Sequence, residues 1–145
     1  MSYCYEYPRP AVTVDIAVIV NNYEVNHILL IQRGKEPFKG MWALPGGFLD
    51  MHETLLEAAH RELFEETGLT IDQLEQFKTY DALDRDPRHR TLSTVFIGFL
   101  KGTLPTVSAM DDAQNAQWFR IAALPPLAFD HAHIIEDIKK RYSLH

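Results

Sequence analysis

The segment spanning residues 46–69, GGFLDMHETLLEAAHRELFEETGL, constrains the fold and chemistry more than any other part of the 145-residue chain. Two adjacent glycines predict a turn, and the residues that follow predict one helix that ends near Gly68. A helix rotates about 100° per residue, so side chains three and four positions apart share a face. The last turns therefore bring together Glu62, Glu65 and Glu66. Clustered carboxylates of this kind indicate a site for a divalent cation.

The acidic face of this helix lies beside its apolar face, because Leu55 and Ala58 fall between or next to the three glutamates on the helical wheel. A solvated acidic stripe normally lies opposite the buried stripe, and like charges at these spacings destabilise a helix by roughly 0.2–0.5 kcal/mol per pair. Arg61 alone is not enough to compensate them. An ordinary amphipathic helix with surface salt bridges is the alternative interpretation.

The residues that flank the helix weaken this alternative. Thr54 and Glu57 predict a capping box, and Gly68 suits a left-handed C-cap. Gly46 and Gly47 permit positive φ and a close approach of the backbone to another group. The segment is therefore predicted to be a strand end, a glycine loop and a capped helix, which suits a carbonyl or amide brought up to a metal or phosphate.

The charge of a pyrophosphate defines what such a site can do. Its oxygens repel an attacking water until cations neutralise them, and hard oxygen ligands select Mg²⁺ or Mn²⁺. Such a metal also lowers the pKa of bound water and stabilises the leaving oxygen. Glu62 and Glu66, one turn apart, are the first choice as metal ligands, with Glu65 as a further ligand or the general base.

The same segment resembles the signature of the Nudix hydrolases at every fixed position, namely Gly47, Glu53, Arg61, Glu62, Leu63, Glu65, Glu66, Gly68 and Leu69. That family comprises metal-dependent enzymes that cleave nucleoside diphosphates linked to another moiety. The resemblance implies that the carbonyl of Gly46 is a further metal ligand. Arg61 is expected to orient the glutamates rather than contact substrate, and Glu53 to pair with Arg61 or support an outer metal.

Length and composition set the remaining bounds. The chain suits one domain, residues 1–145, and its 46% hydrophobic residues are enough for an ordinary core. A net charge of −6 argues against a general nucleic-acid-binding surface, which is usually basic. The single cysteine, Cys4, excludes an internal disulfide. No secretory leader or membrane-spanning run is recognisable, so a cytoplasmic protein without membrane contact is expected.

The pattern along the chain predicts a mixed sheet between helices. Strands do not alternate regularly with helices, which argues against a doubly wound fold. The Nudix resemblance implies an α/β/α sandwich. Asn21-Asn22 predicts a hairpin turn, and Asp130 is expected to cap a final helix at about 131–142. The expected strands are 11–20, 27–32, 41–44, 76–82, 91–100 and 117–119.

A loop at 84–90, DRDPRHR, concentrates arginines in an acidic protein. Arg85, Arg88 or Arg90 is suited to hold a terminal phosphate or ribose, since guanidinium binds phosphate in a bidentate manner. A hydrophilic loop neutralised by its own aspartates is the alternative. This loop, together with segments 46–50 and 127–131, is similar to Nudix ADP-ribose pyrophosphatases and to the effector domains of related transcriptional regulators. That similarity favours a functional role for at least one arginine.

Several other residues are candidates. Asp112 matches a position that supplies a metal ligand or base in some Nudix enzymes, with Asp111 ranked below it and a turn-forming Asp pair as the alternative. Phe48 is a candidate to contact a base or ribose, whereas Trp42 is expected to pack. His131 and His133 diverge on a helix, so both are interpreted as ordinary helix-end histidines rather than a zinc pair.

The function expected from the sequence is Mg²⁺- or Mn²⁺-dependent hydrolysis of ADP-ribose to AMP and ribose 5-phosphate. Hydrolysis of nucleoside triphosphates, including deoxynucleotides, or of nucleotide sugars is the enzymatic alternative. A catalytically silent Nudix domain that senses ADP-ribose-like ligands is the alternative of another class. The complete set of glutamates favours catalysis. A homodimer is compatible with the resemblance.

Overall fold

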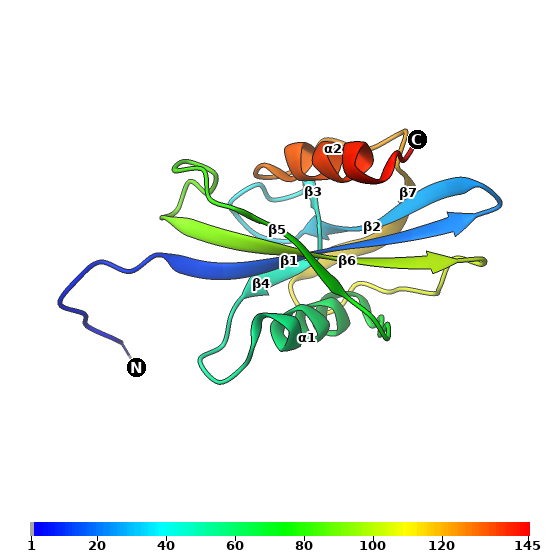
Figure 1. Cartoon of the computed structure of the whole chain (residues 1–145). Coiled ribbons are helices and arrows are strands. Elements are labelled where there is room, and N and C mark those ends of the chain that lie inside the picture. Colours follow the sequence, from blue (N-terminus) through cyan, green and yellow to red (C-terminus); the bar gives the residue numbers. More distant parts are fainter. Residues whose placement is uncertain (1) are drawn as a thin grey trace.

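The computed structural model describes residues 2–145 as one mixed sheet with a helix on each face (Figure 1). The strands are β1 (Ala11–Asn22), β2 (Val25–Arg33), β3 (Trp42–Ala43), β4 (Gly46–Phe48), β5 (Glu75–Tyr80), β6 (Thr91–Lys101) and β7 (Ala113–Arg120). The helices are α1 (Leu55–Thr67) and α2 (His131–Tyr142). The α/β/α sandwich expected from the sequence is confirmed.

The strand order is β3-β2-β1-β6-β5, with β1 and β6 parallel at the centre and the other pairs antiparallel. β1 changes its second partner along its length. Its segment Thr13–Asp15 pairs with β4, whereas Ile19–Asn22 pairs with β2. β7 lies along β2. The sheet is therefore split between β4 and β2, and the glycine strand is positioned at this opening.

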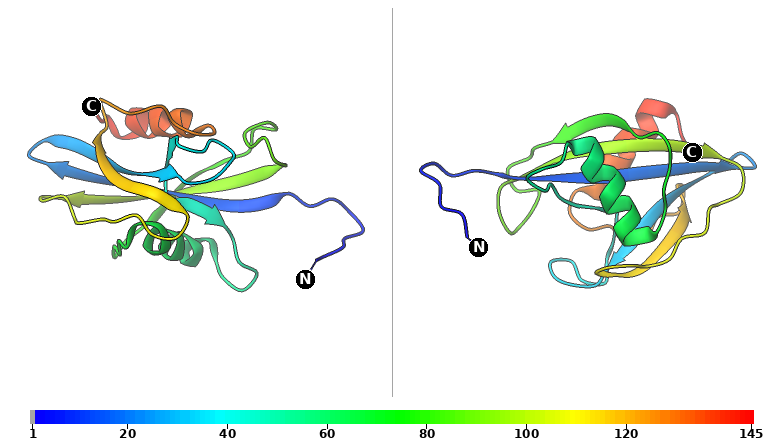
Figure 2. Two further views of the ribbon diagram at one scale, coloured as in Figure 1. Left: turned by 180° about the vertical axis from the view of Figure 1, so that it is seen from behind. Right: turned by 90° about the horizontal axis from the view of Figure 1, so that it is seen from below.

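β1 has a core on each of its two faces, because successive side chains point to opposite sides of a strand. Ala17 and Ile19 face α2, while Ile16 and Val18 face α1. Burial on both sides explains its almost continuous apolar run. Asp15 has the same parity as Ala17, and this places its carboxylate on the side of α2. Figure 2 shows α1 from below, lying across β1 and β6.

The α1 helix begins and ends as its sequence predicts. The Thr54 hydroxyl accepts a hydrogen bond from the Glu57 amide at 3.1 Å, and the Glu57 carboxylate accepts one from the Thr54 amide at 2.9 Å. Gly68 is left-handed at φ 74° and its amide donates to the Phe64 carbonyl. The predicted capping box and C-cap are confirmed, so the register of the three glutamates on the helix is set by local residues.

The predicted position of the hairpin turn is wrong, and the predicted capping by Asp130 is met only in its position. The hairpin turn lies at Tyr23 and Glu24, with φ of 51° and 67°, rather than at Asn21-Asn22, because Asn22 still pairs in register with Val25. A two-residue hairpin turn of this kind needs positive φ at both central positions. Asp130 precedes α2, which spans the predicted 131–142, but its side chain makes no capping hydrogen bond.

No helix within residues 2–145 is long and apolar enough to cross a membrane.

Candidate active site

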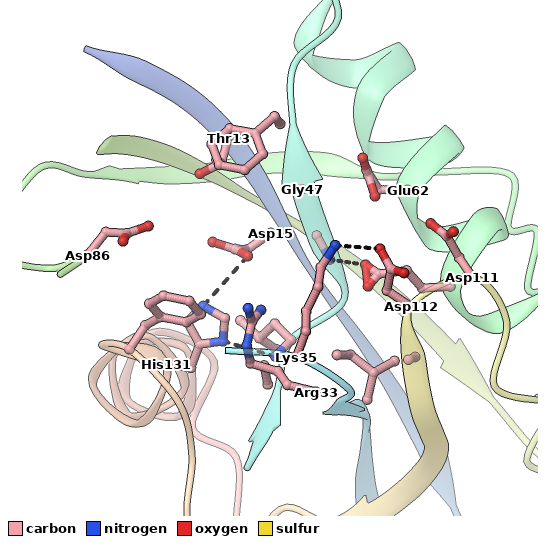
Figure 3. A pocket seen from close by; sticks show the side chains of 18 of the residues that line it. Thr13, Asp15, Arg33, Lys35, Gly47, Glu62, Asp86, Asp111, Asp112 and His131 are labelled. Atoms are coloured by element: carbon pink, nitrogen blue, oxygen red, sulfur yellow. Dashed lines mark hydrogen bonds and ion pairs between the residues drawn. The ribbon is translucent and has the colours of Figure 1, made fainter. Parts of the chain in front are cut away.

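A cavity of about 380 Å³ opens where β1 changes partners, between β4, the end of α1 and the start of α2 (Figure 3). Its volume lies within the range of small-molecule sites. Among the residues named in the sequence analysis, those that line it are Gly46, Gly47, Phe48, Glu62, Glu66, Arg85, Arg88, Asp111, Asp112 and His131. The described lining does not include Glu53, Arg61, Glu65 or Arg90. The cavity therefore contains some, but not all, of the residues that were predicted for catalysis, for metal binding and for substrate binding.

Glu66 is a buried carboxylate at the acidic end of the cavity, with 9% of its surface exposed. Its Oε1 accepts a hydrogen bond from the Gly46 amide at 2.9 Å, which ties α1 to β4. Burial, followed by the negative charges of Glu62, Asp15 and Asp111, raises the pKa of Glu66 to about 8 despite this bond. At neutral pH a nearby cation would favour the ionised form of this carboxylate.

Gly46 and Gly47 are needed for space rather than for positive φ, because both lie in the extended strand β4. The predicted turn with positive φ at these two glycines is therefore wrong, because strand pairing with β1 keeps their backbone extended. A Cβ on Gly47 would lie 2.5 Å from Oε1 of Glu62, and a Cβ on Gly46 would overlap the Val14 carbonyl. The glycines therefore let the strand and the Glu62 carboxylate share one side of the cavity.

Arg61 forms hydrogen bonds with three acidic residues, two on α1 and one just before it. Its guanidinium donates to Glu53 at 2.6 and 2.9 Å, to Glu62 at 2.8 Å and to Glu65 at 3.2 Å. A further bond reaches the Phe48 carbonyl at 3.1 Å. Hydrogen bonds from Arg61 lower the pKa of Glu53 to about 2. The expected Arg61–Glu53 pair is present, and Arg61 is bonded to two of the three glutamates.

The arginines of loop 84–90 differ in their surroundings. Arg85 is almost fully buried and forms a two-bond pair with Asp130, at 2.8 and 2.9 Å. This pair is the reason that Asp130 does not cap α2. Arg88 donates to Asp86 at 2.8 and 3.1 Å. Arg90 donates instead to the carbonyls of Asp81 and Ala82, outside the cavity.

Asp111 and Asp112 reach the cavity from the loop before β7. Asp112 accepts from Lys35 at 2.8 Å, and both side chains of this pair are about two thirds exposed. Asp111 is left-handed at φ 55°. The loop is attached to the end of α1, because the amides of Ser108 and Met110 donate to the carbonyls of Thr67 and Glu66. Two acidic side chains thus stand on the same side of the cavity as Glu66.

Phe48 is 41% exposed at the cavity, with the Arg88 guanidinium 5.4 Å from its ring centroid. An exposed ring beside a guanidinium offers an apolar face for a planar ligand group. Trp42 packs edge-on against Phe119 with ring centroids 4.7 Å apart, as expected for a packing residue.

The sequence interpretation missed Asp15 and misjudged His131. Both are buried and both line the cavity. His131 Nδ1 accepts from the Leu44 amide at 3.0 Å, which leaves the proton on Nε2, 3.6 Å from an Asp15 oxygen. His131 is therefore not an ordinary helix-end residue, whereas His133 is exposed. A charged residue inside the apolar run 11–20 was the one available signal for Asp15.

The Asp15 carboxylate is held ionised by its neighbours. Burial opposes ionisation, but His131, the Ser93 hydroxyl at 2.5 Å and Arg85 together outweigh it and keep the pKa of Asp15 below its usual value. Asp15 also pairs in register with Gly46 across β1 and β4. The polar chain from α2 to β6 thus supports the strand segment that carries Gly46.

The donor set of the cavity fits a hard divalent cation. Glu62, Glu66 and Asp111 line its acidic end together with the backbone of Gly46. No group of three or more acidic, histidine or cysteine side chains within residues 2–145 has the closed spacing of a preformed metal cluster. This is compatible with Mg²⁺ or Mn²⁺, since Mg²⁺ usually keeps several waters and takes few protein ligands.

The chain belongs to the Nudix family: the model of the NUDIX domain matches residues 9–138. It is a Nudix hydrolase. It is 47% identical over 131 residues to the ADP-ribose pyrophosphatase of Methanocaldococcus jannaschii, covering 90% of this chain and 74% of that protein.

Two solved structures are similar over most of the chain. One is the NUDIX domain of Shewanella oneidensis NrtR in complex with ADP ribose, with a TM-score of 0.86, 28% identity, and coverage of 93% of this chain and 90% of that one. The other is a bifunctional NMN adenylyltransferase/ADP ribose pyrophosphatase from Francisella tularensis, complexed with AMP and a Mn ion. It has a TM-score of 0.84 and 35% identity, and covers 94% of this chain but 43% of that one.

Proposed function

We propose that this Nudix hydrolase cleaves nucleoside diphosphate derivatives and that its best substrate is ADP-ribose, which it converts to AMP and ribose 5-phosphate. The observation that carries the proposal is the composition of the cavity. Buried Glu66 and half-buried Glu62 line one end, while Arg85, Arg88 and the exposed Phe48 ring line the other. The likeness to relatives that are named for ADP-ribose or contain it supports the same substrate.

Glu62, Glu66 and the Gly46 carbonyl are the proposed ligands of Mg²⁺ or Mn²⁺, with Asp112 as an additional ligand once released from Lys35. When bound, the metal neutralises phosphate oxygens and lowers the pKa of water. Glu65 is proposed as a further ligand or as the base. Arg61 and Glu53 position the glutamates, since Arg61 bonds to Glu62, to Glu65 and twice to Glu53.

The proposed reaction is a displacement at phosphorus. A water oxygen bonds to one phosphorus of the diphosphate, the bridging P–O bond on that phosphorus breaks, and a site carboxylate takes the proton from water. The exposed ring of Phe48 and the neighbouring guanidinium of Arg88 are proposed to hold the nucleoside or ribose ends.

A substrate screen tests the proposal directly. The protein would be incubated with ADP-ribose, NADH, diadenosine phosphates, nucleotide sugars and nucleoside triphosphates, each with Mg²⁺ and with Mn²⁺. We expect the highest kcat/KM for ADP-ribose, with AMP as a product. Preference for triphosphates or nucleotide sugars would replace the substrate proposal. ADP-ribose binding without turnover under both metals would favour the sensor, an alternative supported by 33% identity to a protein named as an ADPR responsive transcriptional repressor.

Glu66→Gln tests the metal assignment. Glutamine keeps an oxygen that can accept from the Gly46 amide, so the fold should be preserved, while the loss of the charge should reduce metal-dependent AMP release at least ~100-fold. Glu136→Gln is the matched control, because Glu136 lies on α2 outside the cavity lining and its described ion pair is with Lys139. Equal turnover by the Glu66→Gln and Glu136→Gln variants would refute the assignment.

The homodimer stays a prediction, to be checked by light scattering.

A further inference from the structure

Arg33, at the end of β2, is a cavity cation that differs from its neighbours. The cavity is also lined by Lys35, Arg85 and Arg88, and each of these is paired with a carboxylate, namely Asp112, Asp130 and Asp86. Within residues 2–145, the Arg33 guanidinium has no ion pair to a carboxylate. Its described side-chain hydrogen bond runs from Nε to the Pro37 carbonyl at 2.7 Å. The two terminal nitrogens are thus left for a ligand.

The backbone and the aromatic residues around Arg33 hold its side chain in place. The Arg33 amide donates to the Met41 carbonyl and its carbonyl accepts from the Gly40 amide, each at 2.8 Å. The guanidinium lies 4.9 Å from the centroid of the Phe129 ring. Because Nε is also bonded to Pro37, little side-chain freedom remains to be lost when an anion binds.

Arg33 is also close to a second cation. The Arg88 guanidinium lies 5.7 Å from the centroid of the same Phe129 ring. Burial and the charge of Arg88 both lower the pKa of Arg33. Two like charges at one partly desolvated position are unfavourable unless an anion joins them. The cost of this arrangement points to a negatively charged ligand in the cavity.

Arg33 lies between the two ends of the cavity. The carboxylates that act on its charge are Glu66 at the acidic end, Asp86 at the opposite end, and Asp15, which Figure 3 shows between Asp86 and Glu62. Figure 3 shows its side chain between those of His131 and Lys35. A ligand that spans the cavity would therefore place its middle section, rather than either terminus, against this guanidinium.

We propose that Arg33 binds the diphosphate bridge of a nucleoside diphosphate derivative and gives the site anion affinity that does not need the metal. This rests on the proposed function, which supplies a substrate with a diphosphate at its centre. The two free terminal nitrogens match two phosphoryl oxygens in bidentate geometry. Arg85 and Arg88, which the sequence singled out for phosphate, each have one terminal nitrogen bonded to Asp130 or Asp86, so neither offers two free terminal nitrogens to the diphosphate.

The test is calorimetric binding of ADP, inorganic pyrophosphate and adenosine in EDTA. Arg33→Gln should weaken binding of ADP ~10- to 100-fold, as expected for loss of charged hydrogen bonds, and leave adenosine binding unchanged. Pyrophosphate binding should weaken in parallel with ADP. Arg33→Lys should recover part of the ADP affinity, although both substitutions lose the Pro37 bond.

Arg120→Gln is the matched control, since it removes the same charge from an exposed position at the far end of β7. Its ADP affinity should equal that of the unsubstituted protein. Three results would overturn the proposal: equal loss in the Arg33→Gln and Arg120→Gln variants, parallel loss of ADP and adenosine binding, or no ADP binding by the unsubstituted protein in EDTA.

The same variants separate this inference from the proposed function. Arg33-dependent ADP binding without hydrolysis of ADP-ribose under either metal would leave the inference standing and remove the proposed function. Hydrolysis of ADP-ribose together with ADP binding that is unchanged in the Arg33 variants would leave the proposed function standing and remove the inference. In the unfavourable case that Arg33→Gln unfolds, Arg33→Lys against unsubstituted protein provides the comparison, with fewer phosphate bonds expected for lysine.

Discussion

At the residue scale, Glu66 combines features that a free carboxylate would avoid. It is buried, it lies near three other acidic side chains, and its described hydrogen bond is the one that it accepts from the Gly46 amide. Its pKa is raised to about 8, so the folded protein binds a proton here that the unfolded chain has released by neutral pH. The burial of this group links metal binding, pH and stability.

This linkage predicts how the metal-free protein responds to pH. Between pH ~4.5 and ~8 the folded state binds more protons at Glu66 than the unfolded state, so stability falls as pH rises through this window. We expect Tm in EDTA to be at least ~3 °C lower at pH 8 than at pH 6, a difference that Glu66→Gln abolishes. Adding Mg²⁺ at pH 8 should raise the Tm of the unsubstituted protein but not that of the Glu66→Gln variant. A Glu66→Gln variant with the same pH slope would contradict this origin.

At the element scale, β4 and α1 form the part of the site that the sequence predicts best. Their contacts are local: Thr54 caps through Glu57, Gly68 ends the helix, and Arg61 reaches Glu53, Glu62 and Glu65 within eight residues. Short sequence separation makes such contacts readable from spacing. Arg85 and Asp130 are 45 residues apart and Ser93 and Asp15 are 78 apart, so only the fold could pair them.

Substitution of the two glycines separates catalysis from folding. In Gly47→Ala the added Cβ meets the movable end of Glu62, so we expect a near-normal Tm but at least ~10-fold weaker metal activation. In Gly46→Ala the Cβ meets the Val14 carbonyl, which is backbone, so β1–β4 pairing should be lost together with several degrees of Tm. Thermal unfolding and metal titrations check both; the same phenotype for both variants would contradict the distinction.

At the scale of the whole molecule, buried Arg85 connects the loop between β5 and β6 to the start of α2. Its guanidinium is bonded to Asp130 and lies 3.9 Å from Asp15 on the central strand. Removal of one partner from a buried pair leaves an uncompensated charge, so Arg85→Ala should lower the free energy of unfolding by ~3–5 kcal/mol. Urea unfolding measures the loss.

The exposed Lys35–Asp112 pair provides the comparison for this experiment. Both of its side chains are about two thirds exposed, so Lys35→Ala should cost ~1 kcal/mol or less. A cost for Arg85→Ala no greater than that for Lys35→Ala would show that the buried pair is not structural. The predicted role of the arginine loop was incomplete for the same reason: a guanidinium that holds the fold and one that awaits a ligand look identical in sequence.

The change of partner along β1 has a consequence for how this protein can diversify. The segment from β4 to α1 that carries the glutamates attaches to one half of β1, whereas β2, with Arg33 at its end, pairs with the other half. The loops that complete the cavity start from strand ends on either side of the opening. Substitutions in those loops can therefore change which ligand ends fit without altering the segment that carries the glutamates, so the opening in the sheet separates the proposed hydrolytic segment from the segments proposed to set ligand preference.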